Sequence, residues 1–398
     1  HKTKSNNLCD PLNFLKSFIK DKTAPAVYSF KSYPQPGEGV FQHSPDSRIF
    51  TFDKGRFQAW GKVGFGIRAN DHMDSVYNNY GVRYIRLYCD GKLVFASDVN
   101  NIPVSCNRMV NSWGDYDHFL HTKIWFMKSF IEPGNTLPIL RAGADRGIIN
   151  FNQQRDYHLR YVVSDAFGNQ TVKEFTVHGE PQAIPSVAKP EGGVPLYCKK
   201  DNRINADGVR LNIQKGLLAK DGWLLMRTVP MGNALSMGYS FSKAPYPLFN
   251  YAEINIKAKD GIRNPEKLYI AARNSAAGGG PSAYCGGIYT NGWVKGRFRE
   301  LSDIYFLTSD ETAPLITKMN LDPRHLFFKI TDSGSGLKAY QASVDGEFIL
   351  LEFGKNKEVF FCDLTETPVQ RTGKERTLKV SAVDNRDNRR EFVTKIKY

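Results

Sequence analysis

Three polar residues in one short loop are the first candidates for metal binding. The stretch "NDHMDS" (70–75) places Asp71, His72 and Asp74 between two apolar, strand-like segments. Two carboxylates with nearby carbonyl oxygens offer the oxygen-rich ligand set that calcium prefers. The fixed ligand spacing of a calcium loop is absent, and a capped turn between strands explains the same residues. Asp71, His72 and Asp74 are therefore candidate metal ligands, with a capped turn as the alternative.

Two other stretches offer similar chemistry. "TDSGSGL" (331–337) has the composition of a tight turn, with a calcium site as its alternative. His118 and His121 are three residues apart on a predicted helix, which places both imidazoles on one face, as a metal pair requires. The aromatic neighbours indicate that this face is partly core, and no third ligand is evident. Hydrogen-bonded, partly buried histidines are the alternative there.

Aromatic residues near a glycine-rich stretch are the candidates for ligand binding. Tyr284, Tyr289 and Trp293 lie within or just after "AAGGGPSAYCGG" (276–287). Exposed aromatic rings could stack on sugar faces, whereas the alternative is that they pack beneath the loop. The stretch lacks the lysine and the following helix of a phosphate cradle. We therefore carry these three residues forward as a candidate glycan-binding group.

No stretch of the chain has the pattern of an enzyme active site. The P-loop, the dinucleotide-binding glycine motif, the H-E-x-x-H zinc motif and the G-x-S-x-G nucleophile motif are all missing from the sequence. We predict no catalytic residue in this chain. This result favours accessory or binding modules over an enzyme domain.

The sequence segments that position these residues occur twice along the chain. Each copy begins with a D-x-T-A-P segment, continues with an Asp-Gly hairpin, and ends with an apolar strand followed by Asp and a turn closed by Asn. The first copy contains "DKTAP" (21–25), "YCDGKLVF" (88–95) and "YVVSDAFGN" (161–169), and the second contains "DETAP" (310–314), "ASVDGEFIL" (342–350) and "VSAVDNRDN" (380–388). Asp-Gly between apolar runs is a strong hairpin signal. The order predicts two immunoglobulin-like β-sandwich modules, with chance recurrence of common turn residues as the alternative.

These signals divide the chain and define a mostly β fold: tandem immunoglobulin-like sandwiches with a small helical insertion in the first. The predicted parts are a tail of a preceding domain with a short helix (1–20), the first sandwich (21–178), a Pro- and Gly-rich linker (179–194), a middle β-domain (195–309) and the C-terminal sandwich (310–398). Asp10 and Pro11 have the types expected at a helix start. Apolar residues at near-helical spacing predict the inserted helix over 112–131.

Composition narrows the class of protein. The 398 residues contain no run of 18 apolar residues, so no transmembrane helix is predicted. The net charge is +14, but the basic residues are dispersed and no nucleic-acid-binding motif is present. We therefore predict no nucleic-acid partner and favour an exported protein that faces anionic envelope polymers. Six scattered cysteines without a C-x-x-C pair exclude a zinc ribbon and a disulfide scaffold.

The ordered landmarks resemble a known family. "DPLNFL", "DKTAP", "DHMDS", "GVRYIRLYCDGKLVF", "SFIEPGN" and "YVVSDAFGN" follow one another here, and "YTNGWVKGRFRELSDIYFLTSDETAP" and "SGSGLKAYQASVDGEF" come later. This order resembles the noncatalytic C-terminal β-domain region of lysostaphin-type (LytM-like) zinc metallopeptidases, peptidoglycan endopeptidases of Gram-negative envelopes. The family's H-x-x-x-D and H-x-H zinc motifs are missing: His1 is followed by Lys2 and Thr3, and His72 and Asp74 are only two positions apart.

The resemblance implies an accessory role. The chain would position or regulate an upstream peptidase domain in the periplasm or cell envelope and bind peptidoglycan or another envelope glycan. Zinc would belong to that upstream domain, and this chain would hold no cofactor. The alternative is a freestanding envelope or surface adhesion protein built of immunoglobulin-like modules. A third hypothesis, hydrolysis by this chain through His118 and His121, requires a zinc site that their spacing alone does not supply.

Overall fold

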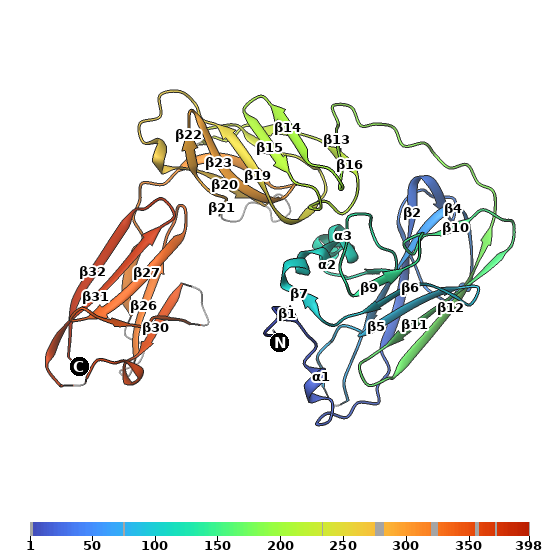
Figure 1. The fold of residues 1–398 in the computed structure, drawn as a ribbon, viewed down its shortest axis with the longest axis horizontal. Coiled ribbons are helices and arrows are strands. Elements are labelled where there is room, and N and C mark those ends of the chain that lie inside the picture. Colours follow the sequence, from blue (N-terminus) through green and yellow to red (C-terminus); the bar gives the residue numbers. More distant parts are fainter. Residues whose placement is uncertain are drawn as a thin grey trace.

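The protein folds into three β-rich modules, each built around its own hydrophobic core (Figure 1). The structure is a computed structural model and describes residues 3–74, 76–232, 234–274, 282–319, 325–354, 358–370 and 372–397. Alternating apolar side chains along the strands fill the cores. The prediction of a mostly β chain of immunoglobulin-like modules, with a small helical insertion in the first, is confirmed.

The first module contains one long curled sheet. Its elements, with the N-terminal segment, are β1 (Asn7–Leu8), α1 (Leu12–Leu15), β2 (Ala26–Phe41), β3 (Arg48–Phe50), β4 (Arg56–Asn70), β5 (Tyr84–Cys89), β6 (Lys92–Asp98), β7 (Ile102–Pro103), η1 (Val104–Met109), α2 (Val110–Trp113), α3 (Tyr116–Thr122), β8 (Met127–Lys128), β9 (Leu140–Ala142), β10 (Ile149–Phe151), β11 (Asp156–Ser164) and β12 (Gln170–Gly179). The main strand order is β3-β2-β4-β12-β11-β5-β6-β9, with β8 and β10 also paired to β4. This order places the ends of β4 and β11 near the segment that leads into β2.

Two register irregularities in β2 help the sheet to curl. They fall between Val27 and Ser29 and between Pro34 and Gly39, where β2 pairs with β4. Irregularities of this kind bend a strand and increase its twist. The curled sheet encloses a core rich in phenylalanine, in which the Phe30 ring contacts six other phenylalanine rings. The inner face of the curled sheet is therefore buried in this core.

The helical insertion is shorter than predicted. Helical turns cover η1, α2 and α3, which together end at Thr122. Lys123 follows with a left-handed backbone (φ 61°) and ends α3. Residues 124–131 are not helical, because Met127 and Lys128 pair with β4 instead. The part of the predicted helix after residue 122 was therefore wrong, since strand pairing overrides its apolar spacing.

The N-terminal segment is attached to the first module. The short helix α1 begins after Pro11, which is its N-cap in place of the predicted Asp10, although the Asp10 side chain accepts the Leu12 N–H at 2.9 Å. The other Asp10 oxygen accepts Arg83 Nη1 at 2.8 Å, and β1 pairs with β7. Phe14 of α1 and Phe18, three residues after its end, remain exposed. The polar contacts of Asp10, rather than burial of the apolar helix face, hold this segment in place.

The middle module consists of two five-stranded sheets and a small two-stranded one. Its elements are β13 (Val194–Leu196), β14 (Asn202–Ala206), β15 (Val209–Ile213), β16 (Gly222–Leu224), β17 (Arg227–Val229), β18 (Gly238–Ser240), β19 (Pro247–Lys257), η2 (Pro265–Lys267), β20 (Leu268–Arg273), β21 (Ala283–Tyr284), β22 (Ile288–Thr290), β23 (Trp293–Glu300) and β24 (Ile304–Ser309). The two larger sheets have the orders β14-β15-β19-β23-β22 and β17-β18-β24-β20-β21. Part of the glycine-rich stretch, residues 275–281, lies outside the described residues.

The last module is a sandwich of two four-stranded sheets. Its elements are β25 (Leu315–Met319), β26 (His325–Thr331), β27 (Leu337–Val344), β28 (Glu347–Ile349), β29 (Glu352–Phe353), β30 (Val359–Asp363), η3 (Leu364–Glu366), β31 (Glu375–Asp384) and β32 (Arg389–Lys397). The sheet orders are β25-β26-β30-β29 and β28-β27-β31-β32. Its hairpin turn repeats that of the first module: Asp345 and Gly346 have φ of 51° and 90°, and Asp90 and Gly91 have 50° and 77°.

Direct contacts join neighbouring modules. Between the first and middle modules, Arg108 Nε donates to the Leu248 carbonyl at 3.0 Å, and the Gly134 N–H donates to the Ala219 carbonyl at 2.7 Å. Between the middle and last modules, Arg386 Nη1 donates to the Leu268 carbonyl at 2.6 Å. No helix among the described residues has the length and apolar character needed to cross a membrane.

Candidate functional site

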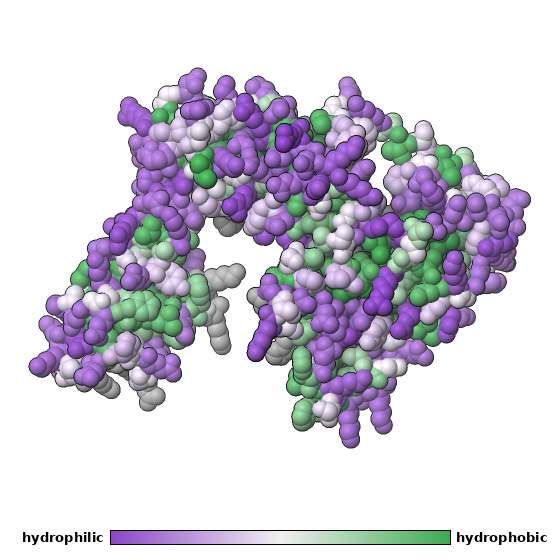
Figure 2. Space-filling view, viewed as in Figure 1, coloured by the Kyte–Doolittle hydropathy of each residue, from purple (hydrophilic) through white to green (hydrophobic). Residues whose placement is uncertain are grey.

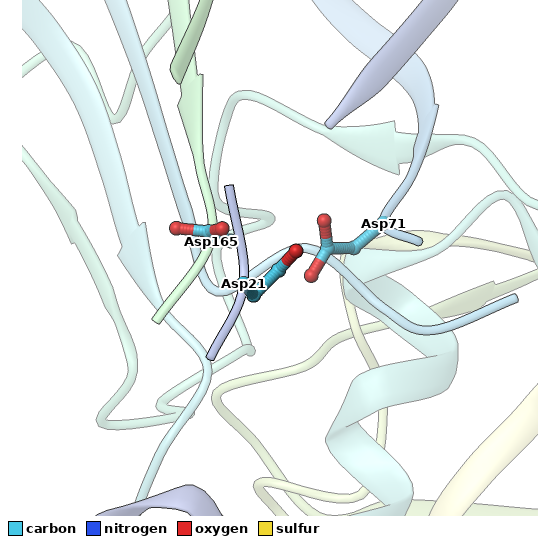
Figure 3. A group of neighbouring side chains, drawn as sticks. All are labelled: Asp21, Asp71 and Asp165. Atoms are coloured by element: carbon cyan, nitrogen blue, oxygen red, sulfur yellow. The ribbon is translucent and has the colours of Figure 1, made fainter. Parts of the chain in front are cut away.

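Three aspartates from distant parts of the first module meet at one end of its sheet (Figure 3). Asp21 lies in the segment that leads into β2, Asp71 follows β4, and Asp165 follows β11. One carboxylate oxygen from each lies within 4.8 Å of the others. In Figure 3 the Asp21 side chain lies between the other two, and one of its oxygens points toward Asp71. We refer to Asp21, Asp71 and Asp165 as the first acidic cluster.

The turn after β11 fixes Asp165 and the lead-in segment together. One Asp165 oxygen accepts the backbone N–H groups of residues 167, 168 and 169 at 2.7–2.9 Å. Its other oxygen accepts Asn169 Nδ2 at 2.7 Å, and the same amide donates to the Asp21 carbonyl at 3.1 Å. The Asp and Asn that closed the predicted turn therefore also anchor the start of the module.

Asp21 and Asp71 are buried, and each has one carboxylate oxygen without a hydrogen-bond partner. Asp21 is 7% exposed and Asp71 is 5% exposed. Asp21 Oδ1 accepts the Thr23 and Asp74 N–H groups, but neither Asp21 Oδ2 nor Asp71 Oδ1 has a hydrogen-bond partner. Burial, followed by the nearby charges of Asp165 and Asp21, raises the pKa of Asp71 to about 6.

No basic side chain among the described residues forms an ion pair with this cluster. The ion pairs of lysines and arginines in the first module are with other carboxylates, those of Asp10, Glu38, Asp90, Asp98, Asp115, Glu132, Asp156 and Glu174. Buried charge without a partner is costly. The negative charge of the cluster therefore lacks a protein counter-charge.

The structure brings together only one of the three residues predicted in this loop. Asp71 belongs to the cluster, whereas neither His72 nor Asp74 does. Asp74 is exposed and supports the lead-in segment: it accepts Thr23 Oγ1 at 2.6 Å and the Lys22 N–H at 3.3 Å. Asp21 and Asp165 were recognised only as turn residues. Their recurrence in the second copy was the signal that could have identified them.

The last module has a matching group, Asp310, Asp332 and Asp384, which we call the second acidic cluster. Asp310 lies in the segment that leads into β25, Asp332 follows β26, and Asp384 ends β31. Asn388 Nδ2 bonds Asp384 Oδ2 at 2.7 Å and the Asp310 carbonyl at 2.9 Å, as Asn169 does in the first module. These two aspartate clusters are the only groups of potential metal ligands that the described part of the chain brings together.

The predicted histidine pair does not form a metal site. His118 packs against the Phe126 ring, with centroids 5.4 Å apart. His121 is largely exposed and lies beside Asp117, with 3.3 Å between Nδ1 and the carboxylate. Burial lowers the pKa of His118, which favours its neutral form. Neither histidine belongs to a group of ligands among the described residues.

The aromatic candidates are divided between two sheets. Tyr289 (39% exposed) and Trp293 lie on β22 and β23, whereas Tyr284 lies on β21 of the opposite sheet. The Tyr284 ring packs on Tyr269, with centroids 5.5 Å apart. The Arg210 guanidinium lies 3.9 Å from the centre of the Trp293 ring. The three rings therefore occupy separate surroundings.

Trp293 belongs to a basic surface that the sequence did not reveal. Side chains that alternate with the core residues of β14, β15, β19 and β23 point outward and form one face of this sheet. The charged ones on these strands are Arg203, Arg210, Glu253, Lys257, Lys295, Arg297 and Arg299, six cations and one carboxylate. We call this surface the basic sheet face. Figure 2 shows the middle module mostly in the colours of hydrophilic residues.

Cross-strand register spreads the cations over the basic sheet face. Arg210 is opposite Asn255, which is opposite Lys295, and Lys257 is opposite Trp293. The single carboxylate, Glu253, pairs with Lys295 at 2.5 Å. The remaining five cations have no ion pair among the described residues. They form an exposed positive surface suited to a polyanion.

Comparison with known proteins gives a family match for the middle module alone. Residues 194–310 match the family described as Zu5-like domain. The match covers less than a third of the chain and says nothing of the other two modules. No curated protein sequence matches the chain significantly.

Similar solved structures include two adhesins and a peptidase fragment. A 1.5-MDa bacterial ice-binding adhesin studied for host cell surface retention aligns with 10% identity over 92% of this chain and 98% of its own, at a TM-score of 0.16. A calcium-stabilised adhesin of an Antarctic bacterium aligns with 9% identity over 94% and 90%, at 0.14. The M60 catalytic domain with two CBM51 domains from Clostridium perfringens ZmpB aligns with 11% identity over 95% and 40%, at 0.13. Scores this low assign no shared fold.

Proposed function

We propose that this chain is a noncatalytic, adhesion-type binding protein of the cell surface or envelope, and that the basic sheet face of its middle module binds an anionic envelope polymer. The proposal rests on one observation, the six cations and single carboxylate on the outward face of β14, β15, β19 and β23. The proposed partner is a glycan that carries phosphate or carboxylate groups. An exported location follows from such a partner.

The geometry of the face suits a long, repetitive anion. Its strands run side by side, so cations recur at strand spacing across the sheet. The Arg210 guanidinium lies over the Trp293 ring, and the Arg299 guanidinium lies over the Tyr251 ring, 4.9 Å from its centre. Guanidinium groups placed over aromatic rings can still make bidentate contacts with phosphate or carboxylate through their N–H groups.

Contacts on both sides of the middle module support a scaffold role. Arg108 and Gly134 of the first module bond to its backbone, and Arg386 of the last module bonds to the Leu268 and Gly287 carbonyls at 2.6 and 2.5 Å. Neighbouring modules joined this way would hold the basic sheet face in a fixed orientation.

A second candidate function comes from the sequence landmarks. Their resemblance to the C-terminal region of lysostaphin-type zinc peptidases proposes an accessory region that places an upstream peptidase on peptidoglycan. The basic sheet face would serve the same purpose there, since cell walls carry anionic polymers. Cleavage of peptidoglycan by the full-length gene product, and not by residues 1–398, would distinguish this candidate.

Binding to immobilised glycans tests the main proposal. The chain should bind a phosphate- or carboxylate-bearing wall polymer and not a neutral glycan of equal length, and salt should weaken the binding. Replacing Arg203, Lys257 and Arg297 by Ser should reduce affinity by about tenfold or more. The matched control replaces Lys54, Lys92 and Arg141, three exposed cations of the first module, by Ser and should leave affinity unchanged.

Equal loss of affinity in the two triple variants would overturn the proposal, because binding would then depend on the net charge of the chain and not on the basic sheet face. So would preferential binding of duplex DNA, which the sequence predicts not to be a partner. Both triple variants change only exposed side chains that make no hydrogen bond, ion pair or ring contact with the described residues, so circular dichroism should show intact folding.

A further inference from the structure

The first acidic cluster carries more negative charge than its surroundings compensate. Asp21, Asp71 and Asp165 are 7%, 5% and 1% exposed. Backbone and side-chain N–H groups satisfy Asp165 fully and one oxygen of Asp21. Asp21 Oδ2 and Asp71 Oδ1 are buried without any partner. Native proteins rarely leave buried polar atoms unsatisfied, so these two oxygens call for an explanation.

A bound cation explains all of these features together. It would accept both free oxygens as ligands and would supply the missing positive charge. In Figure 3 one oxygen of Asp21 points toward the Asp71 carboxylate. The three ligand atoms already lie within 4.8 Å of one another, close enough to contact one ion.

The chemistry of the ligands favours calcium. All three are carboxylates, and no sulfur or imidazole ligand joins them among the described residues, which argues against zinc. Magnesium usually keeps several waters and takes only one or two carboxylates, whereas calcium accepts a larger number of protein oxygens. Backbone carbonyls and water would complete a shell of about six to eight oxygens.

We propose that Asp21, Asp71 and Asp165 bind one calcium ion, which clamps the segment leading into β2 to the ends of β4 and β11. Hydrogen bonds with Asn169 and Asp74 already hold the lead-in segment to the module at this point. The ion would add a direct link between three segments that are distant in sequence. This site is separate from the basic sheet face and does not depend on the proposed function.

Calorimetric titration of the whole chain tests the site. The protein is stripped with EDTA, dialysed and titrated with calcium chloride. One site should appear, and Asp71→Asn should weaken it at least about tenfold because a charged ligand is lost. Asp74→Asn is the matched control in the same loop: Asp74 is exposed and outside the cluster, so calcium affinity should be unchanged.

A second variant guards against misfolding. Asp21→Asn keeps an oxygen for the Thr23 and Asp74 N–H groups and replaces only the free one, so it should fold and still lose at least about tenfold in affinity. Calcium should also raise the melting temperature of the wild type and not that of either variant. No binding at millimolar calcium, or binding that survives both substitutions, would overturn the proposal. Loss of binding in Asp332→Asn alone would also overturn it.

Discussion

In the last module, the loop after Asp332 turns its backbone toward the second acidic cluster, whereas in the first module the loop after Asp71 turns away. Gly334 and Gly336 donate their N–H groups to Asp332 Oδ2 at 3.0 and 2.7 Å, and Ser335 donates to Asp310 Oδ2 at 2.7 Å. Of the described residues in the loop after Asp71, only Asp74 donates to its cluster, at 3.2 Å. Three N–H groups therefore face one cluster and one faces the other.

This difference indicates that backbone N–H groups or a bound cation can each stabilise a cluster of buried carboxylates. Burial acts to raise the pKa of Asp310, but hydrogen bonds from Ser335 and Thr312 outweigh it and hold that pKa below its ordinary value. At Asp71 the balance is reversed: burial and the nearby charges of Asp165 and Asp21 outweigh the backbone N–H of His72, and the pKa rises to about 6. We infer that the second cluster is stable without an ion and that the first depends on one.

Forcing the loop after Asp332 away from the carboxylates should destabilise the second acidic cluster. A Cβ on Gly334 would lie 2.4 Å from the Asp310 carboxyl group, so Gly334→Ala forces the buried aspartate or the loop to move. We expect a cost of about 2–3 kcal/mol to the last module, from steric strain and lost hydrogen bonds. Hydrogen exchange of β26 and β27, followed by mass spectrometry, measures the loss.

Met73 occupies the corresponding position in the first module, two residues after Asp71, and provides the control. Met73→Ala removes no donor to the acidic cluster and should change stability by less than about 1 kcal/mol. Similar costs at Gly334 and Met73 would mean that the loop of the last module has no special role in satisfying the carboxylates.

The stability of the cation-free first module should depend on pH through Asp71. The folded pKa of Asp71 is raised from 3.8 to about 6, so its contribution to stability is complete below pH 4 and is lost as the pH rises through 6. In EDTA, the first module should lose at most about 2 kcal/mol over this range, once solvent screening is allowed for. Hydrogen exchange of β4 and β11, followed by mass spectrometry, measures the stability of this module separately.

Asp71→Asn should remove most of that pH dependence. In the last module the pKa of Asp332 is raised by burial while that of Asp310 is lowered, so their contributions oppose each other and the net change should be smaller. A first module whose stability in EDTA is flat from pH 4 to 7 would contradict the idea that the charge of Asp71 is uncompensated.

Local turn chemistry explains why much of the fold was predictable. The Asp-Gly pairs at 90–91 and 345–346 adopt positive φ at both residues, as hairpin turns of this type require. The D-x-T-A-P segments and the Asp-Asn turns likewise recur with the same bonds, such as Asn169 to the Asp21 carbonyl. These features depend on a few neighbouring residues, so a single sequence reveals them.

The site and the insertion depend on distant partners, and the sequence revealed less of them. Asp71 was identified from its loop, but its neighbours Asp21 and Asp165 are set by the order of the sheet, which the sequence does not state. Residues 124–131 have helical spacing but are not helical, since Met127 pairs with Ile67 of β4. The basic sheet face was missed because its cations come from separate strands.

Asn169 and Asn388 make the same local bonds but differ in their contacts with a neighbouring module. Asn388 Oδ1 also accepts Lys267 Nζ of the middle module at 2.6 Å, whereas no described residue of another module bonds to Asn169. Asn169→Ala and Asn388→Ala should each cost their own module about 1 kcal/mol. Only Asn388→Ala should also increase hydrogen exchange in η2 (Pro265–Lys267), because Lys267 loses one of its two acceptors.

Asn385→Ala is the control, since the Asn385 side chain bonds only within the last module, to the Ser335 and Gly336 carbonyls. Equal exchange in η2 for the Asn385 and Asn388 variants would show that the junction does not rely on this bond, and that the two acidic clusters differ only in their loops.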